Sequence, residues 1–86
     1  DVDAMIQRLG EREWRLSARA EVDHVAEAIG RDLPEGDYET VAGMILENAG
    51  RIPKRGDVVR VDGMTLLVED ATERAVITVR LTLPWG

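Results

Sequence analysis

The sequence contains no cysteine and no phenylalanine, and its only aromatic residues are two tryptophans and one tyrosine. Without cysteine there can be no disulfide framework, no thiolate-bound zinc and no cysteine nucleophile. A chain of 86 residues forms one small domain, which buries only about 60–65% of the surface of the unfolded chain. Because aromatic side chains are scarce, the core must be assembled from valine, leucine, isoleucine, alanine and methionine.

Basic residues are also fewer than acidic ones. The sequence has 11 Lys and Arg and 17 Asp and Glu, which gives a net charge of -6. This balance opposes nonspecific attraction to nucleic acid or to an anionic membrane surface. No apolar run approaches the roughly 18 residues that span a bilayer, and no signal-peptide core is present. We therefore expect no nucleic-acid partner and no direct membrane insertion of this segment. Its first residue is Asp1 rather than Met, which favours a piece cut from a longer protein.

The first part of the chain predicts a hairpin followed by a helix. Residues 5–9 favour a short strand over a helical turn, and residues 10–12 resemble a turn. Apolar side chains then alternate with polar ones in the period of two that a half-buried strand shows, at Trp14, Leu16 and Ala18. From residue 20 the apolar residues recur at i, i+3, i+4 and i+7, the pattern of an amphipathic helix that ends at Gly30. These positions are Val22, Val25, Ala26 and Ile29.

A loop, a second helix and a sharp turn occupy the middle of the chain. Asp37 or Thr40 can cap the start of the helix, because a short side-chain oxygen accepts a hydrogen bond from the free N–H groups of the first turn. Gly50 is suited to end the helix in the left-handed conformation, and Pro53 prevents its continuation. The apolar residues leave almost no polar face, so we expect this helix to be buried. Gly43 costs about 1 kcal/mol relative to alanine, which predicts a close approach of another segment to the backbone.

The last part of the chain predicts three antiparallel strands. The first carries Val59 and Val61, and Asp62-Gly63 is a dipeptide favoured by a two-residue hairpin turn. The second strand alternates Met64, Leu66 and Val68 with Thr65, Leu67 and Glu69. In the third, one face is expected to carry Ile77, Val79, Leu81 and Leu83, and the other Val76, Thr78, Arg80 and Thr82.

The order β-β-α-α-β-β-β predicts an α+β fold in which an antiparallel sheet carries both helices on one face. We expect a loose N-terminal segment over residues 1–4, a single domain over residues 5–83 and a C-terminal tail over residues 84–86.

No motif in the sequence indicates a reaction mechanism. His24 is the only histidine, and nothing stands in a catalytic or metal-ligand spacing with it, so we interpret it as a surface residue of the first helix. The glycines form neither G-x-G-x-x-G nor a P-loop, so no phosphate cradle is predicted. Glu35, Asp37 and Glu39 precede the second helix, where carboxylates can hold Mg²⁺ or Ca²⁺ but are also favoured by the helix dipole alone.

Two further features are candidates for an interface. Arg51, Lys54 and Arg55 follow the second helix, where they can neutralise a phosphate or an acidic partner, or can simply be solvated. Trp14 is interpreted as a core or edge anchor, because no second aromatic is placed to share a nucleic-acid base with it. Trp85 lies beside Pro84 near the end, where it either contacts a neighbouring domain or chain or packs back on its own sheet.

One set of residues is recognisable as a family pattern. It consists of Leu33-Pro34, the run from Tyr38 to Leu46, Gly50-Arg51-Ile52-Pro53 and Gly56-Asp57, with Trp14, Ile29-Gly30, Asp62-Gly63-Met64 and Val79-Arg80-Leu81 around it. The set resembles the CorC/HlyC transporter-associated domain over residues 5–83. The resemblance implies that five of these residues form the structural signature of the family, because they serve in helix caps, close contacts and turns. They are Thr40, Gly43, Gly50, Pro53 and Gly56.

The resemblance implies a C-terminal cytoplasmic domain of a membrane protein, following a transmembrane region and a pair of CBS domains, in proteins named as magnesium and cobalt efflux proteins or hemolysins. It also implies a fold similar to a subdomain of FAD-binding oxidoreductases. The leading hypothesis is a non-catalytic regulatory or interaction domain of an ion transporter. The alternatives are a sensor of FAD or an adenine nucleotide, and a divalent-cation sensor that uses Glu35, Asp37 and Glu39. Formation of a homodimer stays open.

Overall fold

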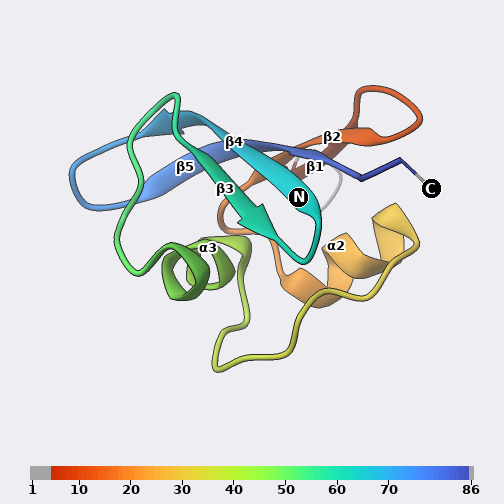
Figure 1. Cartoon of the computed structure of the whole chain (residues 1–86), viewed down its shortest axis with the longest axis horizontal. Helices are drawn as coiled ribbons and strands as arrows, with labels where there is room; N and C mark the ends of the chain where they lie inside the picture. Colours follow the sequence, from red (N-terminus) through yellow and green to blue (C-terminus); the bar gives the residue numbers. More distant parts are fainter. Residues whose placement is uncertain (1–4, 86) are drawn as a thin grey trace.

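A five-stranded antiparallel sheet with two helices against one face makes up the computed structural model (Figure 1), which describes residues 5–85. The elements are β1 (Ile6–Arg8), β2 (Glu13–Ser17), α2 (Val22–Ile29), α3 (Val41–Ala49), β3 (Val58–Val61), β4 (Met64–Ala71) and β5 (Val76–Thr82). This order confirms the α+β prediction. The expected loose segment, residues 1–4, and the last residue of the expected tail, Gly86, lie outside the described residues.

The strand order is β1-β2-β5-β4-β3, so the last strand of the chain lies at the centre of the sheet. It pairs with β2 on one side and with β4 on the other, which joins the N-terminal hairpin to the C-terminal strands. The register places Leu81 opposite Trp14 on β2 and opposite Leu66 on β4. Since opposed residues point to the same face, these three side chains share the buried face of the sheet.

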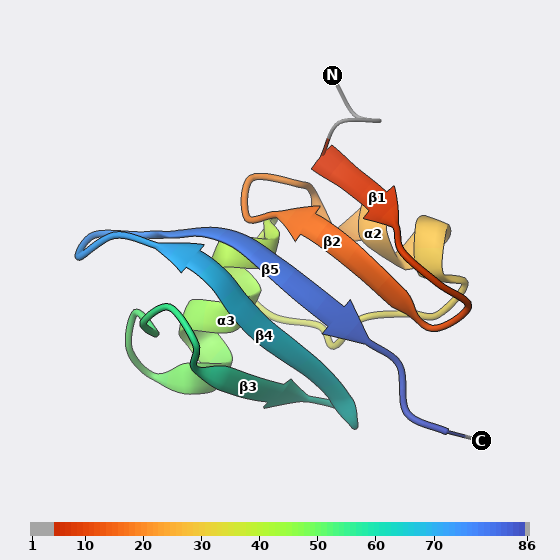
Figure 2. The ribbon, with the colours of Figure 1, turned by 90° about the horizontal axis from the view of Figure 1, so that it is seen from above.

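Both helices cover the same face of the sheet, α2 beneath the β1–β2 hairpin and α3 beneath the β3–β4 side (Figure 2). Their N-terminal ends are joined by backbone hydrogen bonds. The Val22 N–H donates to the Glu39 carbonyl at 2.9 Å, and the Val41 N–H donates to the Ala20 carbonyl at 2.9 Å. These contacts satisfy N–H groups that a helix leaves free in its first turn, and they fix the two helices relative to each other.

The core is aliphatic, as the composition predicts. It combines the inward side chains of the strands with Val25 and Ile29 of α2 and with Val41, Met44 and Ile45 of α3. Trp14 is buried in this core, which confirms its interpretation as an anchor. No polar or charged residue is buried among residues 5–85, so the interior consists of apolar side chains alone.

The prediction for the third C-terminal strand is wrong at its beginning. Val76 is buried while Ile77 is 42% exposed, the reverse of the expected alternation. The pairing with β4 shifts register twice, between Val68 and Asp70 and between Asp70 and Ala71. Each shift lets one residue step out of the ladder, so the side-chain phase inverts between Thr78 and Val76.

The expectation that α3 is buried on all sides is also wrong. Val41, Met44 and Ile45 face the core, but Leu46 is 48% exposed. The helix lies on one side of a two-layer structure, so the sheet covers only the side that faces it. An apolar surface of α3 is therefore left uncovered.

The β3–β4 hairpin confirms the turn expected at Asp62-Gly63. Both residues have positive φ, 50° at Asp62 and 82° at Gly63, as a type I′ turn requires.

Among residues 5–85, no helix has both the length and the apolar character needed to cross a bilayer.

Candidate functional site

The acidic residues singled out in the sequence lie on the exposed loop that leads into α3. Glu35, Asp37 and Glu39 are all exposed, and among residues 5–85 no group of three or more Asp, Glu, His or Cys side chains is close enough to hold a metal ion. The loop is held against the molecule by Tyr38, whose hydroxyl donates to the Pro34 carbonyl. Burial and the nearby Glu47 carboxylate raise the pKa of Tyr38.

Thr40 and Gly43 fix the start of α3. Thr40 is the N-cap, and its hydroxyl accepts a hydrogen bond from the Gly43 N–H at 3.3 Å, so the cap falls to Thr40 and not to Asp37. A Cβ at position 43 would lie 2.8 Å from the Cβ of Tyr38, closer than side chains approach one another. The loop thus passes directly over the helix backbone, as predicted for this glycine.

The turn after α3 positions the basic residues. Gly50 ends the helix with φ of 74°, and Gly56 has φ of 92° at the third position of a turn closed by a hydrogen bond from the Asp57 N–H to the Lys54 carbonyl. The Asp57 carboxylate accepts hydrogen bonds from the Lys54 N–H at 2.9 Å and from Arg51 Nη1 at 3.3 Å. These bonds hold the pKa of Asp57 below its usual range. Arg51 is therefore committed to the turn.

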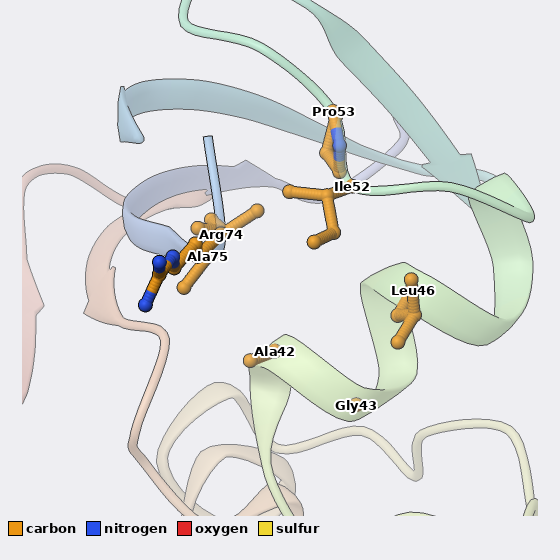
Figure 3. Close-up of a pocket in the computed structure, with 8 residues that line it drawn as sticks. Ala42, Gly43, Leu46, Ile52, Pro53, Arg74 and Ala75 are labelled. Atoms are coloured by element: carbon orange, nitrogen blue, oxygen red, sulfur yellow. The ribbon is translucent and has the colours of Figure 1, made fainter. Parts of the chain in front are cut away.

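An apolar groove of about 150 Å³ lies beside α3 and is called here the α3 groove. Figure 3 shows its three sides: Ala42, Gly43 and Leu46 from α3, the Ile52-Pro53 segment, and Arg74 and Ala75 from the β4–β5 turn. Val76, the first residue of β5, also lines the groove. Pro53 is fully buried under the groove, whereas Leu46 is 48% and Ile52 38% exposed. The site thus combines a fixed floor with two half-exposed branched side chains.

Basic residues lie in this groove and next to it. Arg74 lines one side, and an adjoining depression that shares Ile52 and Pro53 is lined by Lys54 and Arg55. Within residues 5–85, the side chains of Arg74, Lys54 and Arg55 make no ion pair. The groove is therefore a depression with apolar walls and cationic edges.

Of the basic residues identified from the sequence, Lys54 and Arg55 lie beside the groove, whereas Arg51 pairs with Asp57 in the turn. Sequence reasoning missed Leu46, Ile52 and Arg74 as members of this site. The available signal was the apolar character of α3 on all sides, which was interpreted as burial. Arg74 could not be placed because it comes from the β4–β5 turn, distant in sequence from α3.

The other predicted interface residue, Trp85, lies outside the groove. The residue is 85% exposed, and the guanidinium carbon of Arg12 lies 3.1 Å from the centroid of its ring. The same Arg12 donates from Nη1 to the Leu83 carbonyl at 2.8 Å. Trp85 is therefore positioned by a cation–π contact next to the end of β5, with most of the residue exposed to solvent.

The face of the sheet that the helices leave uncovered carries a charged cluster. The Glu69 carboxylate lies 2.8 Å from Arg15 Nε and 2.8 Å from Arg80 Nη2. The hydrogen bond from Arg15 is the largest of the effects that lower the pKa of Glu69. This carboxylate connects β2, β4 and β5 across the sheet.

His24 does not take part in a cluster with the chemistry of a catalytic site. Its Nδ1 lies 3.4 Å from the Glu21 carboxylate on the exposed side of α2, in agreement with a surface helix position.

Among residues 5–85, the α3 groove with its cationic edges is the feature best suited to contact another molecule.

Comparison with known proteins relates the chain to one protein family. The model of the CorC_HlyC family, described as "Transporter associated domain", matches residues 7–84. The magnesium and cobalt efflux protein CorC of Escherichia coli strain K12 is 27% identical over 84 residues, which is 98% of this chain and 28% of CorC. The chain thus spans less than a third of the length of this curated relative.

Solved structures show the same fold. The transporter associated domain CorC_HlyC from Nitrosomonas europaea superposes with a TM-score of 0.82 at 19% identity, covering 94% of this chain and 98% of that one. A CorC_HlyC domain from a Xylella fastidiosa hemolysin, in complex with Mg²⁺ and Mn²⁺, gives a TM-score of 0.76 at 20% identity, covering 92% of this chain and 96% of that one.

Proposed function

The chain belongs to the CorC_HlyC family of transporter associated domains, and from this membership we propose that it is a non-catalytic regulatory and interaction domain of a magnesium and cobalt transport protein. The observation that carries the proposal is the match of nearly the whole chain to 28% of a magnesium and cobalt efflux protein. A module of that size can act on transport only through contacts with the remainder of its protein.

The surface of the domain supports an interaction role. The α3 groove offers apolar walls with cationic edges, and Trp85 offers an exposed aromatic ring. Exposed aliphatic and aromatic side chains of this kind are typical of contact surfaces. We place the domain on the cytoplasmic side, next to a pair of CBS domains and a transmembrane region of the same protein, where it can also meet a second copy of itself.

The proposal is tested by deleting this domain from the full parent protein and measuring magnesium and cobalt efflux at several internal Mg²⁺ concentrations. We expect transport to persist with an altered dependence on internal Mg²⁺, because a regulatory domain biases an equilibrium and does not form the path of the ion. The matched control is Arg19→Glu in the intact protein, since Arg19 is exposed and lies outside the groove. An unchanged Mg²⁺ dependence, or complete loss of transport by a folded deletion variant, would contradict regulation.

A second candidate function is cation sensing by the acidic loop, favoured by the Xylella fastidiosa domain that was solved with Mg²⁺ and Mn²⁺. Mg²⁺ usually keeps several waters and binds through one or two carboxylates, so exposed Glu35, Asp37 and Glu39 can serve without forming a closed cage. The expected result is an increase in melting temperature of this chain with Mg²⁺ that disappears in the triple variant Glu35→Gln, Asp37→Asn, Glu39→Gln. Equal stabilisation of both proteins by Mg²⁺ would assign the ion to another place.

A further inference from the structure

The α3 groove has the dimensions of a pocket for a single side chain. Its volume is about 150 Å³, a size at which an apolar cavity accepts a ligand as large as benzene. Leu46 and Ile52 flank it and remain 48% and 38% exposed, while the buried Pro53 keeps the floor in place. One branched aliphatic or aromatic side chain would fill the pocket and remove both flanking residues from water.

The basic residues at the edges of the groove favour an acidic ligand. Arg74 lines the groove, and Lys54 and Arg55 line the adjoining depression that shares Ile52 and Pro53 with it. The groove itself is lined by no carboxylate, and the adjoining depression is lined by one, that of Glu73. In a chain with a net charge of -6, this local excess of cations is complementary to an acidic partner.

The exposed apolar residues within 5–85 of a second copy do not offer such a partner. Six large apolar residues are exposed among residues 5–85, namely Leu9, Leu46, Ile52, Val58, Ile77 and Trp85. None of them has Asp or Glu as both sequence neighbours. Three apolar or aromatic residues of the sequence do stand between carboxylates, but Val22 and Tyr38 are half-buried against the core of their own chain and Val2 lies outside the described residues. The exposed apolar residues of 5–85 therefore offer no such anchor.

We propose that the α3 groove binds an acidic segment of the same parent polypeptide, outside the present chain, that inserts one branched aliphatic or aromatic side chain between flanking carboxylates. The proposal rests on the proposed function, because the chain corresponds to only 28% of the curated relative. A segment tethered in the same polypeptide has a high effective concentration, so a groove for one side chain is sufficient to hold it. Docking and release of this segment would couple the domain to the rest of the protein.

Photo-crosslinking in the full parent protein tests both the place and the occupant. The photoreactive residue p-benzoylphenylalanine is placed at position 46, and the matched control carries it at position 58, because Val58 is 54% exposed on the other face of the sheet. We expect position 46 to give a crosslink within the same polypeptide, to a segment with Asp or Glu near the crosslinked residue. A crosslink from position 46 to residues 1–4 of this chain, to a second copy, to another protein or to a basic segment, or no crosslink, overturns the proposal.

The charge requirement is tested by Arg74→Glu, with Arg19→Glu as the matched control for an exposed arginine outside the groove. The yield of the crosslink from position 46 should fall on the order of threefold to fivefold in Arg74→Glu and remain unchanged in Arg19→Glu. If Arg74→Glu does not fold, Arg55→Glu replaces it with the same expected result. Equal yields in the folded variant and the control would refute the assigned charge.

The two proposals can fail separately. An absent crosslink together with an altered Mg²⁺ dependence after domain deletion would remove the groove as the contact and leave regulation in place. A specific crosslink with an unchanged Mg²⁺ dependence after deletion would establish docking without regulation.

Discussion

Replacing Gly43 with alanine has two opposing effects on the stability of the domain at the start of α3. Alanine favours a helix over glycine by up to about 1 kcal/mol. The new Cβ, however, would lie 2.8 Å from the Tyr38 Cβ and 3.7 Å from the Tyr38 Cα. Because the obstacle is the root of a side chain and not its flexible end, the loop itself must move, at a typical overpacking cost of about 1–3 kcal/mol.

The clash should therefore exceed the gain in helix propensity, and Gly43→Ala should destabilise the domain by up to about 2 kcal/mol. For a domain of this size, each kcal/mol corresponds to a change in melting temperature of about 4–8 °C. Thermal and urea unfolding followed by far-UV circular dichroism give the melting temperature and the free energy of unfolding.

Two substitutions at Tyr38 separate the clash from other effects of Gly43→Ala. Tyr38→Ala keeps the Cβ, so alanine at position 43 should remain destabilising in that background. Tyr38→Gly removes the Cβ, and in that background Gly43→Ala should become stabilising by about 0.5–1 kcal/mol. An increase in melting temperature for Gly43→Ala in the otherwise unchanged chain would refute the close approach.

Two further predictions concern the helix cap and the charged cluster. Thr40→Ala removes the oxygen that accepts the Gly43 N–H and should cost about 1 kcal/mol of unfolding free energy, whereas Thr40→Ser should preserve most of it; equal losses for both would contradict the capping role. The pKa of Glu69 is lowered in the folded chain by its hydrogen bond from Arg15. This stabilisation is complete above the pKa of the unfolded chain and is lost as pH falls from about 5 through the folded pKa. In urea unfolding across this range, Glu69→Gln should show a weaker pH dependence than the unchanged chain, and parallel curves would count against the arginine contacts.

The local elements could be predicted from the sequence because each depends on residues close together in the chain. The period of two at Trp14 and Leu16, the helix end at Gly50 and the hairpin turn at Asp62 follow from propensities and turn chemistry that act over a few residues. The sequence limited the helix cap to Asp37 or Thr40, and the structure assigned it to Thr40. The aliphatic composition and the absence of cysteine likewise limited the core and the site chemistry before any arrangement in space was known.

The tertiary structure decided which of these local surfaces became buried. The double shift of register against β4 reversed Val76 and Ile77, although the sequence of β5 alternates regularly. Leu46 became exposed because the sheet covers only one side of α3. The α3 groove combines this helix with the Ile52 segment and the turn at Arg74, and the Glu69 cluster combines three strands. Sequence alone set the propensity of each segment, whereas these sites depend on pairings between distant segments, which only the packing of the whole chain selects.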